Sequence, residues 1–351
     1  MPLQQDFFDT SWSMEHKDWA PVKLGFIGAG EMAEFAVLPA LYITEFDLKA
    51  ICDLDEKRAK LMADKFCGGN YYTDYQEMFE KEDLEAVSIQ LQPGEARQRI
   101  AIQAMERGLD VFMPKPPTRT YAEAQQLAEV AQRTGRRLMV NFESRFSYAV
   151  RMAKKIMSRP EFGKLTQGSF SFCTGTYKDR ISYRHGSPYK DTVHAYLLDF
   201  TPHHLDLARY LCGEVKQMAL FHNEWEGEST NAVALQFASG AVGTLQLNSN
   251  RIWWRNYDHI ELTGQGEYAV LESLWNIKHY TLGQNTFTEN YRDERSVELT
   301  GDGFAMREFV ASIRENRQPI ANIADCAKTM ELYQAIYDAV CEGRDGIILQ
   351  K

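Results

Sequence analysis

Between Lys23 and about Asn141 the chain alternates short apolar runs with longer segments of helical periodicity. Strands that alternate with helices in this way indicate βαβ units and a doubly wound parallel sheet. Helical periodicity is clearest over Glu95–Arg107 and Tyr121–Thr134. The apolar runs predict strands over Lys23–Ile27, Leu48–Cys52, Ala86–Leu91, Asp110–Met113 and Arg137–Val140.

After Phe146 the pattern changes, because from Val215 to about Leu299 the chain reads as consecutive strands. Two of them flank the turn Ala238-Ser239-Gly240, which is a hairpin signal. Runs of strands with few helices between them favour a mostly antiparallel sheet. The expected elements are helices over Ser147–Ser158, Phe304–Asn316 and Ala324–Cys341 and strands over Leu165–Phe172, Thr230–Phe237 and Ala241–Asn248.

The composition of the 351-residue chain fits two domains with hydrophobic cores. A net charge of −10 argues against nucleic acid as the main partner. Six scattered cysteines without a Cys-x-x-Cys pair favour reduced thiols and a cytoplasmic protein. No apolar run approaches the roughly 20 residues of a membrane span. We expect an N-terminal arm over 1–20, a dinucleotide-binding domain over 21–142 and a substrate-binding and oligomerisation domain over 143–351.

The first strand runs into Gly-Ala-Gly-Glu-Met-Ala, which meets the Gly-x-Gly-x-x-Ala pattern of dinucleotide-binding turns. Gly28 permits the tight turn, Gly30 lets a pyrophosphate approach the backbone, and amides at the following helix start face the anion. Asp53 ends the second strand, where a carboxylate accepts from the adenosine ribose hydroxyls and repels a 2′-phosphate. This favours NAD, while Arg58 leaves NADP open. The cofactor contacts expected here are Gly28, Ala29, Gly30, Glu31, Met32 and Asp53.

Lys115 follows the strand Asp110–Met113 immediately, so it lies at the rim where ligands of doubly wound sheets gather. Prolines on both sides (Pro114, Pro116 and Pro117) limit the motion of its backbone. A lysine there can hydrogen-bond a substrate hydroxyl and lower its pKa while a base removes the proton. The alternative is a solvated loop lysine, and the rigid frame favours the functional interpretation.

Asp199 and His203 lie four residues apart, so on a helix they share one face. Histidine titrates near neutral pH and can take a proton from a hydroxyl as hydride leaves the carbon. Asp199 then either orients the ring or binds a neighbouring substrate hydroxyl. Since proline fits best near a helix start, Pro202 predicts that the helix begins or kinks around Thr201.

Two further residues, His204 and Asp206, compete for these roles. Together with His203 they also form an alternative metal set, which no further ligand spacing supports. We therefore expect no metal.

The motifs together resemble the glucose–fructose oxidoreductase / inositol dehydrogenase / rhizopine catabolism (Gfo/Idh/MocA) family over roughly Lys23 to Ala339. The glycine turn meets the family pattern. The Glu-Lys-Pro signature is matched with proline in place of glutamate, and Asp-x-Gly-x-His-x-x-Asp with threonine in place of glycine. The residues that carry these matches are Gly28, Gly30, Ala33, Pro114, Lys115, Pro116, Asp199, Thr201, His203 and Asp206.

The resemblance implies a Rossmann domain followed by an α/β domain whose open sheet makes oligomer contacts, in a homodimer or homotetramer. It also implies sugar or cyclitol chemistry, with Lys115, Asp199 and His203 as the catalytic set. Gln92 and Pro93, with Lys115, complete the expected cofactor contacts, although Arg97 stands where the family often has histidine. Glu143 stands where asparagine is common. These departures indicate a changed substrate or weakened catalysis.

The segment 174–191 interleaves basic and aromatic side chains and leads directly into the helix of Asp199. Aromatic rings suit sugar faces, and guanidinium groups suit a carboxylate or phosphate. The alternative is a solvated loop. The substrate contacts that we expect are Arg180, Tyr183, Arg184 and His204, with Arg180 or Arg184 on an acidic group of the substrate.

The leading functional hypothesis is an NAD(P)-dependent oxidoreductase that transfers hydride between nicotinamide and a hydroxyl or keto carbon of a sugar, cyclitol or sugar derivative. A redox-neutral enzyme that holds NAD tightly, oxidises a sugar, eliminates or hydrolyses, and reduces again is the first alternative. A non-catalytic NAD-binding regulator is the second. Trp253, Trp254 and Tyr257 in the strand-rich half would suit a sheet-to-sheet dimer.

Overall fold

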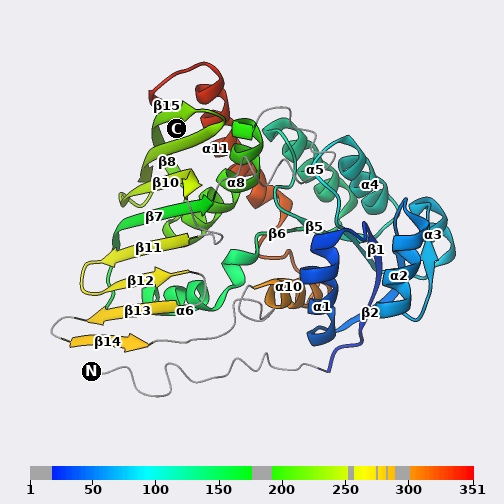
Figure 1. Ribbon diagram of the computed structural model, residues 1–351. Coiled ribbons are helices and arrows are strands. Elements are labelled where there is room, and N and C mark those ends of the chain that lie inside the picture. Colours follow the sequence, from blue (N-terminus) through cyan, green and yellow to red (C-terminus); the bar gives the residue numbers. More distant parts are fainter. Residues whose placement is uncertain (1–17, 176–191, 252–256, 274–275, 282–283, 289–300) are drawn as a thin grey trace. The chain divides into compact units, whose positions relative to one another are not determined.

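A computed structural model describes residues 18–175, 192–251, 257–273, 276–281, 284–288 and 301–351 (Figure 1). The chain forms two compact units. The first unit contains the described residues of Ser13–Glu143 and Gly301–Met330, and the second those of Ser144–Thr300 and Glu331–Lys351. Residues 301–330, which we assigned by chain order to the second domain, therefore cluster with the first.

The sheet of the first unit is parallel and six-stranded, in the order β3-β2-β1-β4-β5-β6. This order confirms the expected doubly wound sheet, whose strand order reverses between β1 and β4. The strands are β1 (Val22–Ile27), β2 (Phe46–Cys52), β3 (Tyr71–Tyr72), β4 (Ala86–Ile89), β5 (Asp110–Pro114) and β6 (Leu138–Asn141). Its helices are α2 (Glu56–Phe66), α3 (Tyr75–Lys81), α4 (Glu95–Glu106), α5 (Tyr121–Thr134), α10 (Asp302–Arg314) and the start of α11 (Ile323–Cys341).

Local chemistry explains why the helices of this unit begin and end where the sequence predicts. Helix α5 starts with a capping box, in which the Thr120 hydroxyl accepts from the Glu123 amide and the Glu123 carboxylate accepts from the Thr120 amide. It stops at Gly135, whose φ of +65° suits glycine. The capping box and the terminal glycine both act between residues that are close in sequence, so they do not depend on the tertiary structure.

The helix after the glycine turn contains a π-helical segment, η2 (Ala33–Val37), which leads into α1 (Leu38–Ala40) and the 3₁₀ turn η3 (Leu41–Ile43). Here the Leu38 amide donates to the Ala33 carbonyl, five residues back. Pro39 follows at once and has no amide hydrogen to donate. A single π turn beside a proline relieves the crowding that an α-helix would impose.

The second unit is built on a mostly antiparallel nine-stranded sheet of described residues, in the order β14-β13-β12-β11-β7-β10-β9-β8-β15. Only the neighbours β7 and β10 run parallel. The strands are β7 (Leu165–Gly175), β8 (Val215–Trp225), β9 (Glu228–Phe237), β10 (Val242–Arg251), β11 (Tyr257–Gly264), β12 (Tyr268–Glu272), β13 (Asn276–Thr281), β14 (Gln284–Thr288) and β15 (Gly346–Gln350). The expected hairpin is formed by β9 and β10.

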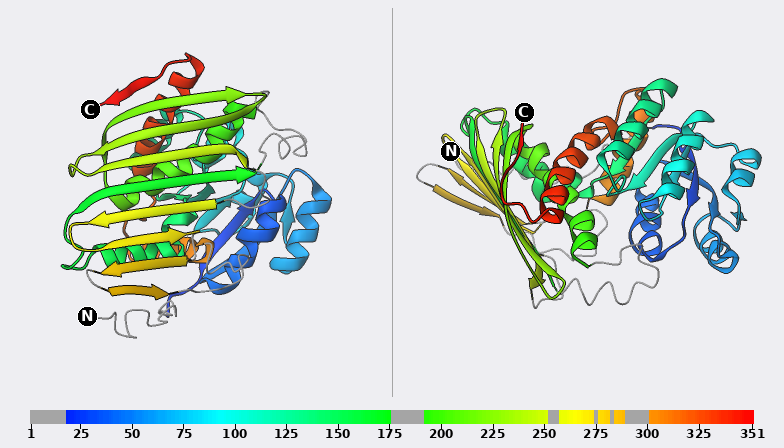
Figure 2. Two further views of the ribbon diagram at one scale, coloured as in Figure 1. Left: turned by 60° about the vertical axis from the view of Figure 1, so that its left-hand side comes forward. Right: turned by 90° about the horizontal axis from the view of Figure 1, so that it is seen from above.

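Two helices of this unit, α6 (Tyr148–Met157) and α8 (Thr192–Cys212), pack on the same face of the sheet (Figure 2). The opposite face carries no helix among the described residues of the unit. Along β9 and β10 buried and exposed side chains alternate, as expected for a sheet with one covered face. Trp253 and Trp254 lie outside the described residues.

Of the two alternatives that we expected for Pro202, a helix start around Thr201 was wrong. Helix α8 runs from Thr192 through Cys212 with Pro202 inside it, and does not begin around Thr201. An interior proline removes a backbone hydrogen bond and costs about 3 kcal/mol. Burial of the apolar side chains on both sides of Pro202, such as Leu198 and Leu205, offsets that loss. No described helix is both long and apolar enough to cross a membrane.

Candidate functional site

The glycine turn after β1 has room for a ligand on one side only. Gly28 has φ +94°, and a Cβ there would meet the Gln90 carbonyl oxygen at 2.6 Å, so no other residue fits. Its amide donates to the Cys52 carbonyl oxygen at 2.8 Å. A Cβ on Gly30 would meet nothing within 4 Å. The space beside the Gly30 backbone is therefore open, and a pyrophosphate contact there stays a prediction.

The carboxylate of Asp53 connects the end of β2 to this turn. Its Oδ2 accepts from the Ala29 amide at 2.7 Å, and its Oδ1 accepts from the Asp55 amide at 2.9 Å. Each carboxylate oxygen has a second lone pair, so Asp53 can still accept from ribose hydroxyls. Because the Ala29 amide is already bonded, the next amides at the helix start, from Gly30 onward, are the ones that can face an anion.

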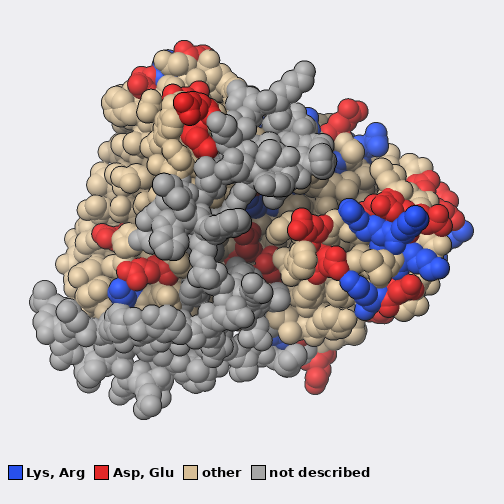
Figure 3. Space-filling model, in the orientation of Figure 1, with Lys and Arg blue, Asp and Glu red and all other residues tan. Residues whose placement is uncertain are grey.

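A cavity of about 320 Å³ lies between the glycine turn and α2. Leu61 and Met62 supply apolar surface for an adenine ring, and Lys57 and Arg58 supply positive charge beside acidic neighbours. Basic and acidic side chains are intermixed over the visible face of this unit (Figure 3). The residues present therefore fit a dinucleotide. The residues that line the cavity are Ala29, Glu31, Glu34, Lys57, Arg58, Leu61 and Met62.

Lys115 follows β5 directly and is half-buried, and its peptide bond to Pro116 is cis. The neighbouring backbone is held by Arg97, a fully buried residue of α4. Arg97 Nη1 donates to the Leu91 carbonyl oxygen at 2.9 Å, and Nη2 donates to the carbonyl oxygens of Pro116 and, at 2.7 Å, Pro117. One guanidinium thus connects the end of β4 to the segment that carries Lys115.

The remaining expected cofactor contacts lie on the same edge of the sheet as Lys115. Gln92 and Pro93 follow β4 and precede α4, Gln92 exposed and Pro93 buried. The Arg119 guanidinium donates to the Pro93 carbonyl oxygen at 2.9 Å. The carboxyl edge of the parallel sheet therefore brings together the glycine turn, Asp53, Gln92-Pro93 and Lys115.

The second unit contains Asp199 and His203, both on α8. Asp199 is half-buried, while His203 is 9% exposed. His203 Nε2 lies 2.8 Å from the hydroxyl oxygen of Ser144, which belongs to the short 3₁₀ turn η4 (Glu143–Phe146). The candidate base therefore hydrogen-bonds a buried serine that the sequence did not single out.

The next residue of the turn, Arg145, forms a buried ion pair with Asp206 of α8. Arg145 Nε donates to Asp206 Oδ2 at 2.6 Å, and Nη2 donates to Oδ1. The two side chains are 3% and 1% exposed. The Arg145 guanidinium also lies over the Tyr210 ring, 5.2 Å from its centroid. Asp206 is therefore bound to a cation of its own unit.

His204, which we expected to contact substrate, is engaged at both ring nitrogens. Nδ1 lies 2.8 Å from the Phe200 carbonyl oxygen, and Nε2 lies 3.1 Å from Asp258 Oδ1. Its ring also packs on Phe172, with centroids 3.8 Å apart. These contacts place His204 in the packing between α8 and β7.

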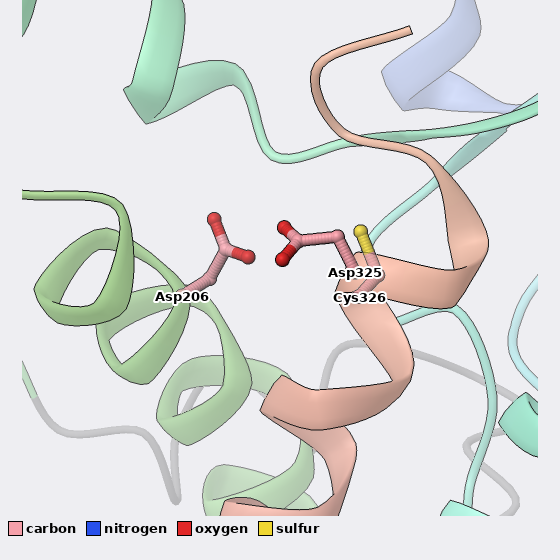
Figure 4. A group of neighbouring side chains, drawn as sticks. All are labelled: Asp206, Asp325 and Cys326. Atoms are coloured by element: carbon pink, nitrogen blue, oxygen red, sulfur yellow. The ribbon is translucent and has the colours of Figure 1, made fainter. Parts of the chain in front are cut away.

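The alternative metal set is not favoured by these contacts. His204 and Asp206 already have the partners described above, and the Arg145 charge repels a cation at Asp206. Figure 4 shows Asp206 on α8 and Asp325 and Cys326 on the first turns of α11. The Cys326 thiol has its own partner, the Ala321 carbonyl oxygen at 3.5 Å. We do not infer a metal site from these residues.

Three expected substrate contacts, Arg180, Tyr183 and Arg184, lie outside the described residues. The sequence assigned no contacts of this kind to two residues, since it marked Arg97 only as a departure from the family pattern and did not single out Ser144. Arg97 occupies the apolar stripe of α4 that contains Ile100, Ala101 and Ala104, and a charged residue in such a stripe is a usable signal. Ser144 carries no comparable signal, because its partner lies 59 residues away.

Comparison with known proteins identifies the family. Residues 22–142 match the Gfo/Idh/MocA oxidoreductase family, described as an NAD-binding Rossmann fold, and residues 150–269 match the family's C-terminal domain. Levoglucosan dehydrogenase of Pseudarthrobacter phenanthrenivorans is 26% identical over 81% of this chain and 77% of its own. Myo-inositol 2-dehydrogenase of Thermotoga maritima is 25% identical, over 87% of this chain and 92% of its own.

The fold likeness extends over most of the chain. The crystal structure of a dehydrogenase from Chromobacterium violaceum superposes with a TM-score of 0.85 at 21% identity, covering 93% of this chain and 97% of the other. The glycine turn, Asp53 and the sheet order agree with the family description. The protein thus belongs to the Gfo/Idh/MocA oxidoreductase family, and its first unit is an NAD-binding Rossmann domain.

Proposed function

We propose that the protein is an NAD-dependent dehydrogenase or reductase of a sugar, cyclitol or sugar derivative, with His203 as acid/base and Lys115 assisting. The observation that carries the proposal is a buried histidine with a hydrogen-bonded ring nitrogen on α8, in a chain whose Rossmann unit retains a lysine at the sheet edge. Two curated relatives are named as levoglucosan and myo-inositol dehydrogenases, which supports a polyhydroxylated substrate.

In this proposal the nicotinamide accepts hydride when bound, and the protein moves the proton. His203 takes the hydroxyl proton of the carbon that is oxidised. Lys115 donates a hydrogen bond to that oxygen and stabilises the negative charge that develops on it. Asp199, four residues before His203 on α8, binds a neighbouring hydroxyl. In the reverse direction His203 returns the proton to the alkoxide.

We propose that the protein prefers NAD to NADP. Asp53 places a negative charge beside the glycine turn, which opposes a 2′-phosphate. Lys57 and Arg58 at the cavity supply the charge that would partly offset this. We therefore expect the protein to bind NAD more tightly than NADP but still to accept NADP.

We also propose that the protein forms a homodimer or homotetramer through the uncovered face of its large sheet. Ala232 and Ala234 of β9 and Thr244 and Gln246 of β10 are exposed there. These four side chains carry no charge, and the cores of protein interfaces are depleted of charged residues. Sedimentation of Ala234→Arg should show a smaller species than the parent protein.

The experiment that tests the function is NADH formation from NAD with a panel of cyclitols, aldoses, glycosides and uronic acids. His203→Ala should lower kcat by about 10²–10⁴-fold, the usual contribution of a general base. Lys115→Met should lower kcat by a similar or smaller factor. His222→Ala, a histidine of β8 that bonds Asp345, is the matched control and should keep parental activity.

Turnover that disappears in His203→Ala supports the dehydrogenase. Turnover that survives His203→Ala assigns the proton transfer to another group. If no substrate of the panel yields NADH while NAD stays bound to the purified protein, the proposal is contradicted. The reaction to test next is then bond cleavage in a sugar without net release of NADH.

A further inference from the structure

We propose that Arg97 is a positioning residue that fixes the spacing between Lys115 and the loop of the expected cofactor contacts. That loop, which contains Gln92 and Pro93, connects β4 to α4. The inference deepens the proposed function and rests on it, because the role of Lys115 is given there. The geometry that carries it is one fully buried guanidinium that donates to backbone carbonyl oxygens of both loops.

The loop that carries Lys115 can satisfy few of its own carbonyl oxygens. Three of the four residues in 114–117 are prolines, which have no amide hydrogen to donate. Turns within the segment therefore lack their usual donors. Pro116 and Pro117 are buried, and buried carbonyl groups need a hydrogen-bond partner. The segment therefore depends on donors from another part of the unit.

Arg97 supplies these donors from α4. Its side chain is 1% exposed, and its Nη2 donates to the carbonyl oxygens of Pro116 and, at 2.7 Å, Pro117. Its Nη1 donates to the Pro114 carbonyl oxygen at 3.4 Å. A single side chain therefore binds the backbone on both sides of Lys115, which limits the directions in which the lysine can point.

The same guanidinium also holds the neighbouring loop. Arg97 Nη1 donates to the Leu91 carbonyl oxygen at 2.9 Å, directly before the expected cofactor contacts. A guanidinium is planar and its N–H groups point in fixed directions, so the two loops are held at one separation. The single nitrogen of a lysine side chain could not serve both loops in this way.

A second arginine connects the two loops at an exposed position. Arg119 belongs to the loop that carries Lys115, and its guanidinium donates to the Pro93 carbonyl oxygen at 2.9 Å. A Cβ on Gly94 would lie 3.0 Å from Arg119 Nη2, so a glycine there leaves room for the guanidinium. The loops are therefore connected at a buried point and at an exposed point, and we expect them to move as one body.

This connection matters for the proposed reaction. Lys115 donates there to the oxygen of the carbon that gives up hydride, so its position relative to the cofactor has to be precise. A misplacement of about 1 Å in such a group can cost about 10²-fold in rate. Arg97 prevents such a displacement because it joins the two loops through their backbones. It acts through Lys115, and it neither takes nor gives a proton.

The first test is a double-mutant cycle between Arg97→Lys and Lys115→Met, read as NADH formation with a substrate of the panel. Arg97→Lys should lower kcat about tenfold in the parent with little change in KM. In the Lys115→Met background the same change should lower kcat by less than about twofold, because the residue that Arg97 positions is gone. Equal factors in both backgrounds would mean that Arg97 does not act through Lys115 and would overturn the inference.

Arg137→Lys is the matched control for the loss of a buried guanidinium. Arg137 is 7% exposed and lies immediately before β6, at the opposite edge of the same sheet. It donates to the Arg317 carbonyl oxygen at 2.9 Å and to Asp110 Oδ2 at 3.0 Å. Arg137→Lys should lose stability and keep the parental kcat. If it lowers kcat as much as Arg97→Lys does, lost stability explains both effects and the positioning role is wrong.

A second readout needs neither a substrate nor a variant. In the cofactor-free parent, the amides of 91–94 and 115–120 should exchange with deuterium with the same dependence on urea, because the two loops open as one unit. Mass spectrometry of the peptides measures this. Both segments should exchange faster in Arg97→Lys, and neither should in Arg137→Lys. Segments that open independently of each other in the parent would contradict the connection through Arg97.

The outcomes keep the two proposals apart. If His203→Ala abolishes turnover but the effects of Arg97→Lys and Lys115→Met on kcat are additive, the dehydrogenase stands and the positioning role is wrong. If no substrate is turned over, the proposed function fails, and the exchange measurement still decides whether Arg97 joins the two loops. If Arg97→Lys does not fold, the exchange pattern of the parent decides the same question.

Discussion

Arg97 Nη2 lies 2.7 Å from the carbonyl oxygen of Pro117, two residues beyond Lys115. The same guanidinium donates to the Leu91 carbonyl at the end of the neighbouring strand. A single buried cation on α4 therefore connects the backbone after β4 to the segment that carries Lys115, at the sheet edge where the cofactor is expected. The reach of this guanidinium explains how the proline-rich segment is held.

Replacement of Arg97 by alanine should destabilise the first unit by about 3–5 kcal/mol, because several buried carbonyl oxygens lose their donor. The stability of Arg97→Lys should lie between that of the parent and that of Arg97→Ala, since lysine keeps the positive charge but lacks the planar set of N–H donors of the guanidinium. Urea unfolding measures the difference. Arg99→Ala, an exposed arginine on the same helix, should stay within about 0.5 kcal/mol. An unchanged midpoint for Arg97→Ala would show that water satisfies these carbonyl groups instead.

Asp53→Asn should weaken NAD binding by about tenfold and narrow the preference over NADP. The amide loses the negative charge that opposes a 2′-phosphate, and one of the two acceptors for the Ala29 and Asp55 amides becomes a donor. Fluorescence titration with NADH and NADPH measures this without a substrate.

The control for Asp53→Asn is Asp55→Asn, which changes the N-cap of α2. That variant should lose at most about 1 kcal/mol of stability and keep the cofactor preference of the parent. If the parent, Asp53→Asn and Asp55→Asn all show the same ratio of NADH to NADPH affinity, Asp53 does not select the cofactor.

Breaking the Arg145–Asp206 pair should be costly, because either single change leaves a buried charge without its partner. Arg145→Met and Asp206→Leu should each cost about 3–5 kcal/mol, and the double variant should recover much of that loss. A double-mutant cycle in urea measures the coupling. The exposed pair Arg133–Glu106 serves as the comparison and should couple by about 0–1 kcal/mol. Additive losses at the buried pair would mean that the two charges act independently.

The ion pair between Glu85 and Arg314 should make stability depend on pH. The Arg314 guanidinium, which bonds both Glu85 oxygens, holds the pKa of that carboxyl below its ordinary value of 4.5. Because the pKa is lower in the folded state, the stabilisation is present above pH 4.5 and is lost as the pH falls through the folded pKa. Glu85→Gln should therefore unfold more easily than the parent at pH 7, and the difference should shrink in acid. A difference that is constant with pH would argue against this linkage.

Much of the fold follows from signals that act between neighbours in the sequence. The apolar run Val22–Ile27 is buried on both faces of a parallel strand, and the capping box at Thr120 starts α5 at the predicted residue. The glycine turn and Asp53 belong to one βαβ unit, so their proximity follows once that unit is recognised. The resemblance to the family added Lys115, Asp199 and His203 as a catalytic set, whose roles remain predictions.

Tertiary structure alone decided the rest, because the partners come from distant parts of the chain. Pro202 would end an isolated helix, yet burial of the surrounding apolar side chains carries α8 through it. Ser144 meets His203 across 59 residues, and Gly301–Met330 clusters with the Rossmann unit rather than with its neighbours in sequence. Local propensity determines which segments become helices and strands, whereas the pairing of their side chains depends on packing that no short stretch of sequence contains.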